Sequence, residues 1–226
     1  MISMSNWTFS VGGGHPALVA SGHIPPPTPF SYATHIDLLV ALANGFDLPP
    51  GQIEDRLWAG ASALGWPKLY SRLRTLEHFP KYRSKSYDTY KAAALAKSTG
   101  HATPEQLALA SGLSREIQLS AVQIPPGQVL FHGRSDTIPS IGPTYPAFLS
   151  TTLNPFVARQ SAKRRIIQLG GRKVVYALTV QTSQPALWGH VGRSGEWELL
   201  LDADLPVLQT GFHRGTEFDI VEADIG

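Results

Sequence analysis

A change of pattern at Pro125-Pro126-Gly127 constrains the fold of this chain more than any other feature. Between residues 35 and 120, apolar residues recur at helical spacing, between polar caps and glycine stops. After the change, short runs of high strand propensity follow one another, with one helical segment embedded among them. This order predicts an α+β protein in which an N-terminal helical lobe precedes a β-rich core.

The length of 226 residues suits one domain with an extension. Residues 1–34 contain a glycine triplet and a proline triplet, and we expect them to be irregular. We expect a helical lobe over 35–120 and a β-rich core over 121–226, with 35–226 forming one functional domain.

Several helices can be placed within the expected lobe. The segment His35–Ala43 is apolar and is stopped by Gly45, and two further helices are expected between residues 52 and 76. Thr103-Pro104-Glu105-Gln106 combines a threonine cap, a proline at the first position and a glutamine at the capping-box position. This segment predicts a helix start, and Gly112 predicts a break in the same helix.

Composition excludes several classes of protein. The chain has no cysteine, so disulfides, thiolate catalysis and cysteine-type zinc sites are excluded. Its eight histidines form no His-x-x-x-His pair, and we expect no metal. The N-terminus does not resemble a secretory signal, and no apolar run is long enough for a membrane span. The net charge of +2 does not by itself indicate nucleic-acid binding.

Three short segments carry residue types that suggest chemistry. In the strand expected over Glu196–Leu201, side-chain alternation places Glu196 and Glu198 on one face. One carboxylate of such a pair can stabilise developing positive charge while the other holds a nucleophile. A solvated strand face is an equally good interpretation of this segment alone.

The other two segments are weaker by themselves. Ser150-Thr151-Thr152 ends an expected strand and precedes a helix that begins after Asn154, so its hydroxyls could orient a carboxylate or a ribose, or simply cap. Phe131-His132-Gly133-Arg134 combines an imidazole that can bond a ribose with a glycine that allows close approach of a ligand. A structural histidine is the alternative for His132.

Together, the order and spacing of these segments resemble the ADP-ribosyltransferase superfamily, in particular the Arg-Ser-Glu branch of bacterial toxins and effectors. Phe148-Leu149-Ser150-Thr151-Thr152 is similar to the second motif of that branch, and Glu196-Trp197-Glu198 to the third. The resemblance covers roughly residues 115–224. It implies a split β-sandwich core behind the helical lobe and NAD as the substrate, without a metal.

The first motif departs from this branch. His132 stands where the branch has arginine, as in the histidine branch that includes poly-ADP-ribose polymerases. A neutral imidazole grips a pyrophosphate less well than a guanidinium does. Arg134, two residues further on, is the expected replacement for the missing charge.

The resemblance implies a role for each candidate residue. Glu198 is the central catalytic residue, Ser150 fixes it, and Glu196 handles the acceptor. The expected NAD-binding residues are His132, Gly133, Arg134, Ser150, Thr151 and Thr152. The segment from Trp188 to Ser194 matches the family's target-recognition loop, with Trp188 and Arg193 as expected contacts, although a packing role for Trp188 is a close alternative.

The resemblance also implies a reaction and a setting. The expected enzyme is a mono-ADP-ribosyltransferase, a glycosyltransferase that releases nicotinamide and modifies a protein arginine, with nucleic acid left open as acceptor. The alternatives are an NAD glycohydrolase toxin or a catalytically weak binding module. We expect a bacterial toxin or effector that acts in the cytoplasm, or is delivered to a target-cell cytoplasm without a signal peptide. It could be paired with an antitoxin or immunity protein.

Overall fold

The computed structural model describes most of the chain beyond the N-terminal region, over residues 35–44, 73–84, 86–120, 122–136, 141–169, 171–191 and 196–226. The segment 1–34 and the expected helix over 52–64 lie outside these residues, as does most of the helix expected from Pro67.

The described helices are α2 (His35–Ala43), α5 (His78–Tyr82), α6 (Tyr87–Ser98), α7 (Pro104–Ser120) and α8 (Pro155–Leu169). α2 has the predicted bounds. α7 begins as its capping box predicts, because the Gln106 backbone N–H donates to Thr103 Oγ1 at 3.3 Å and the Thr103 N–H donates to Gln106 Oε1 at 2.9 Å. No helix in the described part of the chain is long and apolar enough to cross a membrane.

The predicted break at Gly112 is wrong, because α7 continues through it to Ser120. A Cβ atom at Gly112 would overlap the imidazole of His78 on α5. This glycine therefore serves close packing between two helices, and the cost of a glycine inside a helix is small enough to be tolerated.

The strands are β1 (Val122–Ile124), β2 (Val129–Asp136), β3 (Thr144–Tyr145), β4 (Leu149–Thr152), β5 (Arg172–Val180), β6 (Gln184–Val191), β7 (Glu196–Leu201), β8 (Leu205–His213) and β9 (Asp219–Ile225). They form one curled sheet in the order β1-β6-β7-β4-β2-β5-β9-β8-β3. All neighbours are antiparallel except β5 and β9, which are parallel.

One junction divides this sheet into two halves. β2 and β4 share a single register pair, Phe131 with Thr152, whereas β2 and β5 pair along their full lengths. The half β1-β6-β7-β4 therefore diverges from the half β2-β5-β9-β8-β3 at this point. The expected split β-sandwich takes the form of a continuous sheet that is nearly interrupted between β2 and β4.

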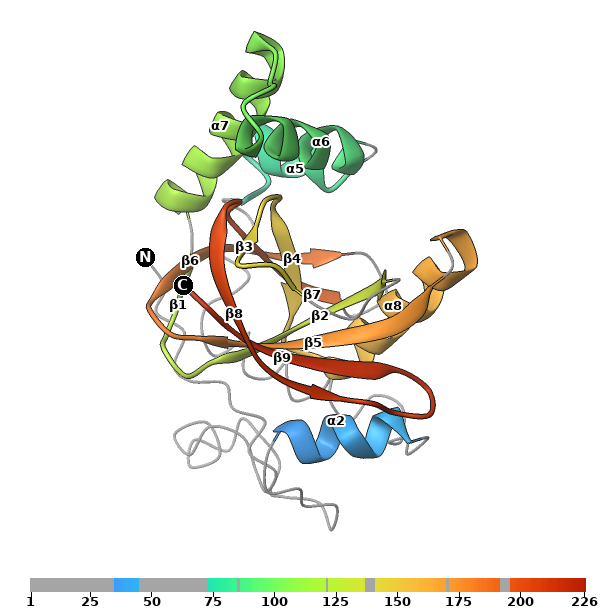
Figure 1. The fold of residues 1–226 in the computed structure, drawn as a ribbon. Helices are drawn as coiled ribbons and strands as arrows, with labels where there is room; N and C mark the ends of the chain where they lie inside the picture. The colour runs from blue at the N-terminus through green and yellow to red at the C-terminus, as the bar shows by residue number, and fades with distance from the viewer. Residues whose placement is uncertain are drawn as a thin grey trace.

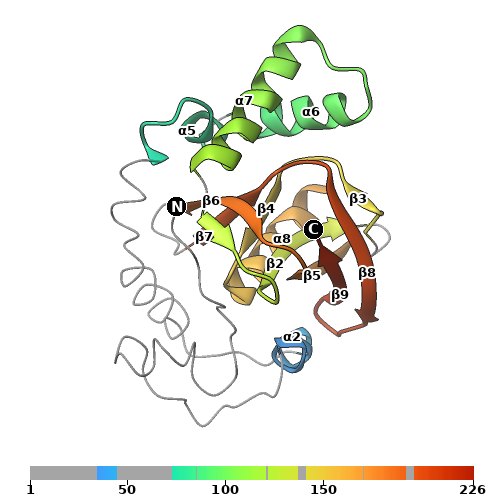
Figure 2. The same cartoon turned by 90° about the vertical axis from the view of Figure 1, so that its left-hand side faces the viewer.

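The helices lie on different sides of the sheet. Figures 1 and 2 show α5, α6 and α7 gathered at one end of the strands, with α2 at the opposite side of the molecule. One buried cluster joins α5, α6 and α7 to the sheet, and a second lies between the other sheet face, α2 and α8. The helices expected to form a single lobe over 35–120 are thus separated, since α2 packs against β9.

Candidate active site

A cavity of about 280 Å³ opens where β2 and β4 diverge. Three groups of side chains surround it: one from the helical end, one from β2 and α8, and one from β4 and β7. In that order they are Tyr82, Arg83 and Tyr87; Phe131, His132, Gly133, Val157, Ala158 and Ser161; and Ser150, Thr151, Thr152 and Glu198. The near-interruption of the sheet thus coincides with a recess that is lined by both polar and apolar side chains.

Each carboxylate oxygen of Glu198 has a polar neighbour. The Ser150 hydroxyl donates to Oε1 at 2.6 Å, and the Arg83 Nε atom lies 4.0 Å from Oε2. The Glu198 side chain is only 12% exposed. The strand register explains the first contact. Thr152 on β4 is the register partner of Glu198 on β7, and Ser150, two residues before Thr152, lies on the same face of the sheet. The predicted link between Ser150 and Glu198 is present in the geometry.

His132 connects the two halves of the sheet. Its Nδ1 atom lies 2.6 Å from the carbonyl oxygen of Ser150. A carbonyl only accepts hydrogen bonds, so Nδ1 carries the proton and donates. This bond crosses the junction where the β2–β4 ladder has almost ended. It fixes both the imidazole and the residue that holds Glu198.

Thr151 and Thr152 line the cavity, but their hydroxyls also form hydrogen bonds with the backbone. Thr151 Oγ1 donates to the Leu199 carbonyl at 2.8 Å, and Thr152 Oγ1 accepts from the Asn154 N–H at 3.0 Å. Asn154 Oδ1 in turn accepts from the Phe156 N–H at 2.9 Å and caps α8. The hydroxyl cluster therefore ends a strand and starts a helix beside the cavity.

Gly133 lies inside β2 rather than at its end. A Cβ atom at this position would overlap the carbonyl oxygen of Ala158 on α8. Close approach at Gly133 is therefore required by the helix, which packs directly on the strand. The expectation that a strand-end glycine admits a ligand needs this correction, although Gly133 does line the cavity.

Arg134 does not line the cavity. Its guanidinium pairs with Asp136 Oδ1 at 2.5 Å and lies 5.9 Å from the centre of the Tyr176 ring. Tyr176 donates a short hydrogen bond to the same carboxylate. The structure thus gives Arg134 a role in a polar cluster beside the cavity, where the sequence led us to expect a phosphate ligand. The guanidinium that reaches the cavity is that of Arg83.

The expected target-recognition segment is largely a strand. Residues 184–191 form β6, and Trp188 is 1% exposed within the main buried cluster. This burial favours the packing role for Trp188 and removes it as a surface contact. Glu196 lies opposite Val191 at the start of β7, but its side chain lies outside what the structure describes, as does Arg193.

Sequence reasoning missed Tyr82, Arg83 and Tyr87. Tyr82 ends α5, Arg83 directly follows it and Tyr87 begins α6. The five residues of α5 are too few to show a periodic pattern. The only available signal was local, a dense aromatic and basic run from Phe79 to Arg83. Within the described residues, His, Asp and Glu form no group of three or more that could hold a metal ion.

Comparison with solved structures defines the class: the chain has the fold of the ADP-ribosyltransferases, as the motifs indicated. One similar protein is Vis, an ADP-ribosyltransferase toxin from Vibrio splendidus. Vis in complex with an inhibitor named M6 matches with a TM-score of 0.54 at 14% identity, over 82% of this chain and 90% of that chain. The Vis toxin structure matches with a TM-score of 0.51 at 14% identity, over the same shares of the two chains.

A third structure, Vis in complex with agmatine, matches with a TM-score of 0.53 at 14% identity, over 81% of this chain and 89% of that chain. No protein-family model matches the sequence, and no curated protein matches it either. Structural similarity therefore establishes the fold alone.

Proposed function

We propose that this protein is a mono-ADP-ribosyltransferase that cleaves NAD to nicotinamide and transfers ADP-ribose to an acceptor. The observation that carries the proposal is the Ser150 hydroxyl donating to Glu198 inside the cavity. A carboxylate held in a recess, with one oxygen fixed by a neighbouring strand, is suited to stabilise positive charge that develops beside it. The fold shared with ADP-ribosyltransferases supports the same proposal.

In the proposed reaction, the bond between nicotinamide and the ribose carbon breaks, and its electron pair leaves with nicotinamide. The ribose then carries oxocarbenium-like positive charge. Glu198 hydrogen-bonds a ribose hydroxyl and stabilises that charge, and Ser150 keeps the carboxylate in place. An acceptor nucleophile forms the new bond to the ribose carbon, and its proton passes to a base, for which Glu196 is the candidate.

We propose a protein arginine as the acceptor. A guanidinium pairs naturally with a carboxylate, and Glu196 precedes Glu198 by two residues on β7. Vis has been solved in complex with agmatine, which carries a guanidinium group. In the same proposal NAD is the substrate, and His132, Gly133, Ser150, Thr151 and Thr152 bind it from the cavity wall.

Vis, which has a similar fold, is a toxin, and this similarity supports a proposal about where the protein acts. We propose that the protein is a toxin or effector that acts in a cytoplasm, its own or that of a target cell. A partner that neutralises it, of the antitoxin or immunity type, belongs to this proposal.

The test is to incubate the protein with labelled NAD and a cell lysate, and to measure nicotinamide release and macromolecular labelling together. Glu198→Gln is nearly isosteric but removes the charge, so we expect NAD turnover to fall about 10²- to 10³-fold. Glu105→Gln is the matched control, because this glutamate is exposed on α7.

Each outcome has a definite meaning. Labelling supports a transferase, and nicotinamide release without labelling means a hydrolase. Absence of both in the wild-type protein means a binding module. Turnover of NAD by Glu198→Gln within a few-fold of wild type would place the active site elsewhere.

A further inference from the structure

The residue that faces Glu198 from the helical end of the molecule is Arg83, which directly follows α5. Its Nε atom lies 4.0 Å from Glu198 Oε2, and its side chain is 17% exposed. Ser150 holds the other oxygen of the same carboxylate. The carboxylate is thus contacted by a hydroxyl from β4 on one oxygen and faced by a guanidinium from outside the sheet on the other.

The position of the Arg83 guanidinium is fixed by its neighbours. It lies 5.6 Å from the centre of the Phe79 ring. It also lies against Gly189 on β6, where an added Cβ atom would come within 2.9 Å of Arg83 Nη1 and 2.8 Å of Phe79 Cζ. Gly189 is the register partner of Glu198. The absence of a side chain at Gly189 therefore gives the guanidinium its place beside the carboxylate.

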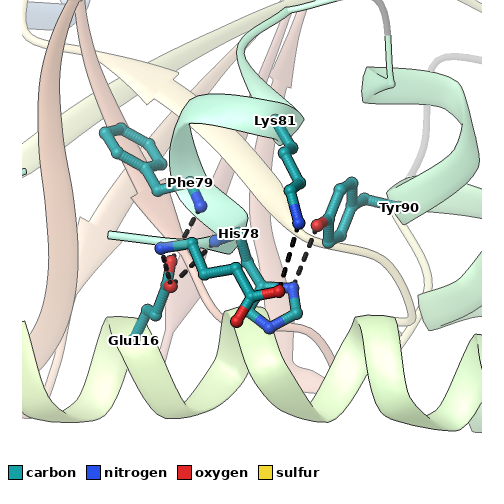
Figure 3. A network of polar contacts seen from close by, with 6 residues as sticks. His78, Phe79, Lys81, Tyr90 and Glu116 are labelled. Atoms are coloured by element: carbon teal, nitrogen blue, oxygen red, sulfur yellow. Dashed lines mark hydrogen bonds and ion pairs between the residues drawn. The ribbon is translucent and has the colours of Figure 1, made fainter. Parts of the chain in front are cut away.

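α5 is itself anchored to α7, as Figure 3 shows. Glu116 accepts backbone N–H groups of Glu77 and His78 on Oε1, at 2.7 and 2.8 Å, and that of Phe79 on Oε2, at 2.7 Å. His78 fits over Gly112 of α7, and its Nδ1 atom lies 3.0 Å from the Tyr90 hydroxyl. These contacts hold the helix whose end supplies Arg83.

We propose that Arg83 is a positioning residue for Glu198, which faces the carboxylate oxygen that Ser150 does not contact and keeps the carboxylate ionised for NAD cleavage. The inference rests on the proposed function and extends it to the helical end of the molecule. An opposite charge at about 4 Å favours the ionised form of a carboxyl group, and more so in a partly buried site.

The other titratable groups around the cavity are weaker candidates for this task. His132 comes from β2 and uses Nδ1 to bond the Ser150 carbonyl. Tyr82 and Tyr87 line the helical wall, and a phenol hydroxyl brings no positive charge to the carboxylate. Glu196 lies two residues before Glu198 on β7, and a carboxyl group brings no positive charge. Among the described cavity residues, Arg83 is the one with a permanent positive charge.

The test compares four variants in the full-length protein. Arg83→Gln removes the charge, and Arg83→Lys retains it. Gly189→Ala retains both charged groups. Its methyl group takes space that the Phe79 ring and the Arg83 guanidinium now occupy, so we expect it to displace the guanidinium. Lys81→Gln is the matched control, because it also removes a cation from α5. The Lys81 side chain is 57% exposed and is paired with Glu77.

The first readout is the NMR titration of the Glu198 carboxyl carbon, assigned by its loss in Glu198→Gln, which needs no turnover. We expect the pKa of Glu198 to rise by about one unit in Arg83→Gln. We expect a smaller rise in Gly189→Ala, and values near wild type in Arg83→Lys and Lys81→Gln. The acid limb of nicotinamide release should move to higher pH in the same order.

An unchanged Glu198 titration in Arg83→Gln would overturn the proposal, as would an equal shift in Lys81→Gln. A raised Michaelis constant for NAD with an unchanged titration would overturn it in favour of direct NAD binding by Arg83. Wild-type protein that titrates as expected but never releases nicotinamide would refute the proposed function while leaving this electrostatic arrangement established.

Discussion

Two glutamates on one strand divide the chemistry proposed for this protein between bond cleavage and acceptor handling. Glu198 is fixed by Ser150 in the cavity, and Glu196 begins the same strand two residues earlier. We expect Glu196→Gln to suppress acceptor labelling while NAD hydrolysis continues, because water needs less positioning than a guanidinium does. Measuring nicotinamide release and labelling on one sample checks this, and parallel loss of both signals would contradict it.

At the residue scale, the sequence was informative where the chemistry lies on regular strands. Alternation along β7 and the register of β4 are local properties, and they bring Ser150 to Glu198 as predicted. Arg134 lies outside the cavity lining, and Arg83, which lies in it, was missed. Both outcomes have the same cause. Which cation reaches the cavity depends on how α5 docks, and no local pattern reports the docking of a five-residue helix.

Among the elements, the packing of α8 on β2 is the tightest contact beside the cavity. Because a Cβ atom at Gly133 would overlap the Ala158 carbonyl, we expect Gly133→Ala to destabilise the protein by about 1–3 kcal/mol or more, as overpacking does. Chemical denaturation measures this change. Gly142→Ala is the control, since the nearest atom to its added Cβ is 3.9 Å away. Equal stability of the two variants would show that α8 can move away from β2.

Elements with their own boundary signals were predictable, and elements defined by their partners were not. The apolar run of α2 and the capping box of α7 each carry a local start signal, and both helices begin where predicted. The end of β6, from Trp188 to Val191, was expected to belong to a recognition loop because the family resemblance places that loop there. β6 is a strand because β1 and β7 pair with it on both sides. Tertiary context decides such segments.

For the molecule as a whole, the buried cluster around Tyr176 makes stability depend on pH. Burial, together with the hydrogen bond to Asp136, raises the pKa of the Tyr176 phenol above its ordinary value of 10.0. The unfolded chain therefore loses this proton before the folded chain does. The stabilisation is complete below about pH 10 and declines as the pH rises further.

We therefore expect the melting temperature to fall steeply above about pH 10, and Tyr176→Phe to reduce that slope. Thermal unfolding at a series of alkaline pH values measures it. Tyr87→Phe, which changes a half-buried phenol on the cavity wall, is the matched control. A slope that Tyr176→Phe leaves unchanged would assign the alkaline transition to other groups.

The single register pair between β2 and β4 also has a kinetic consequence. The cavity at this junction takes its walls from the adjoining ends of α5 and α6, three strands and α8, and its lining residues run from Tyr82 to Glu198. Few ladder bonds hold the junction, so its geometry depends on both halves of the sheet having already formed. Long-range contacts of this kind form slowly and late during folding. A newly made or refolding chain would thus acquire its secondary structure well before its chemistry, and a partly folded copy would be catalytically silent.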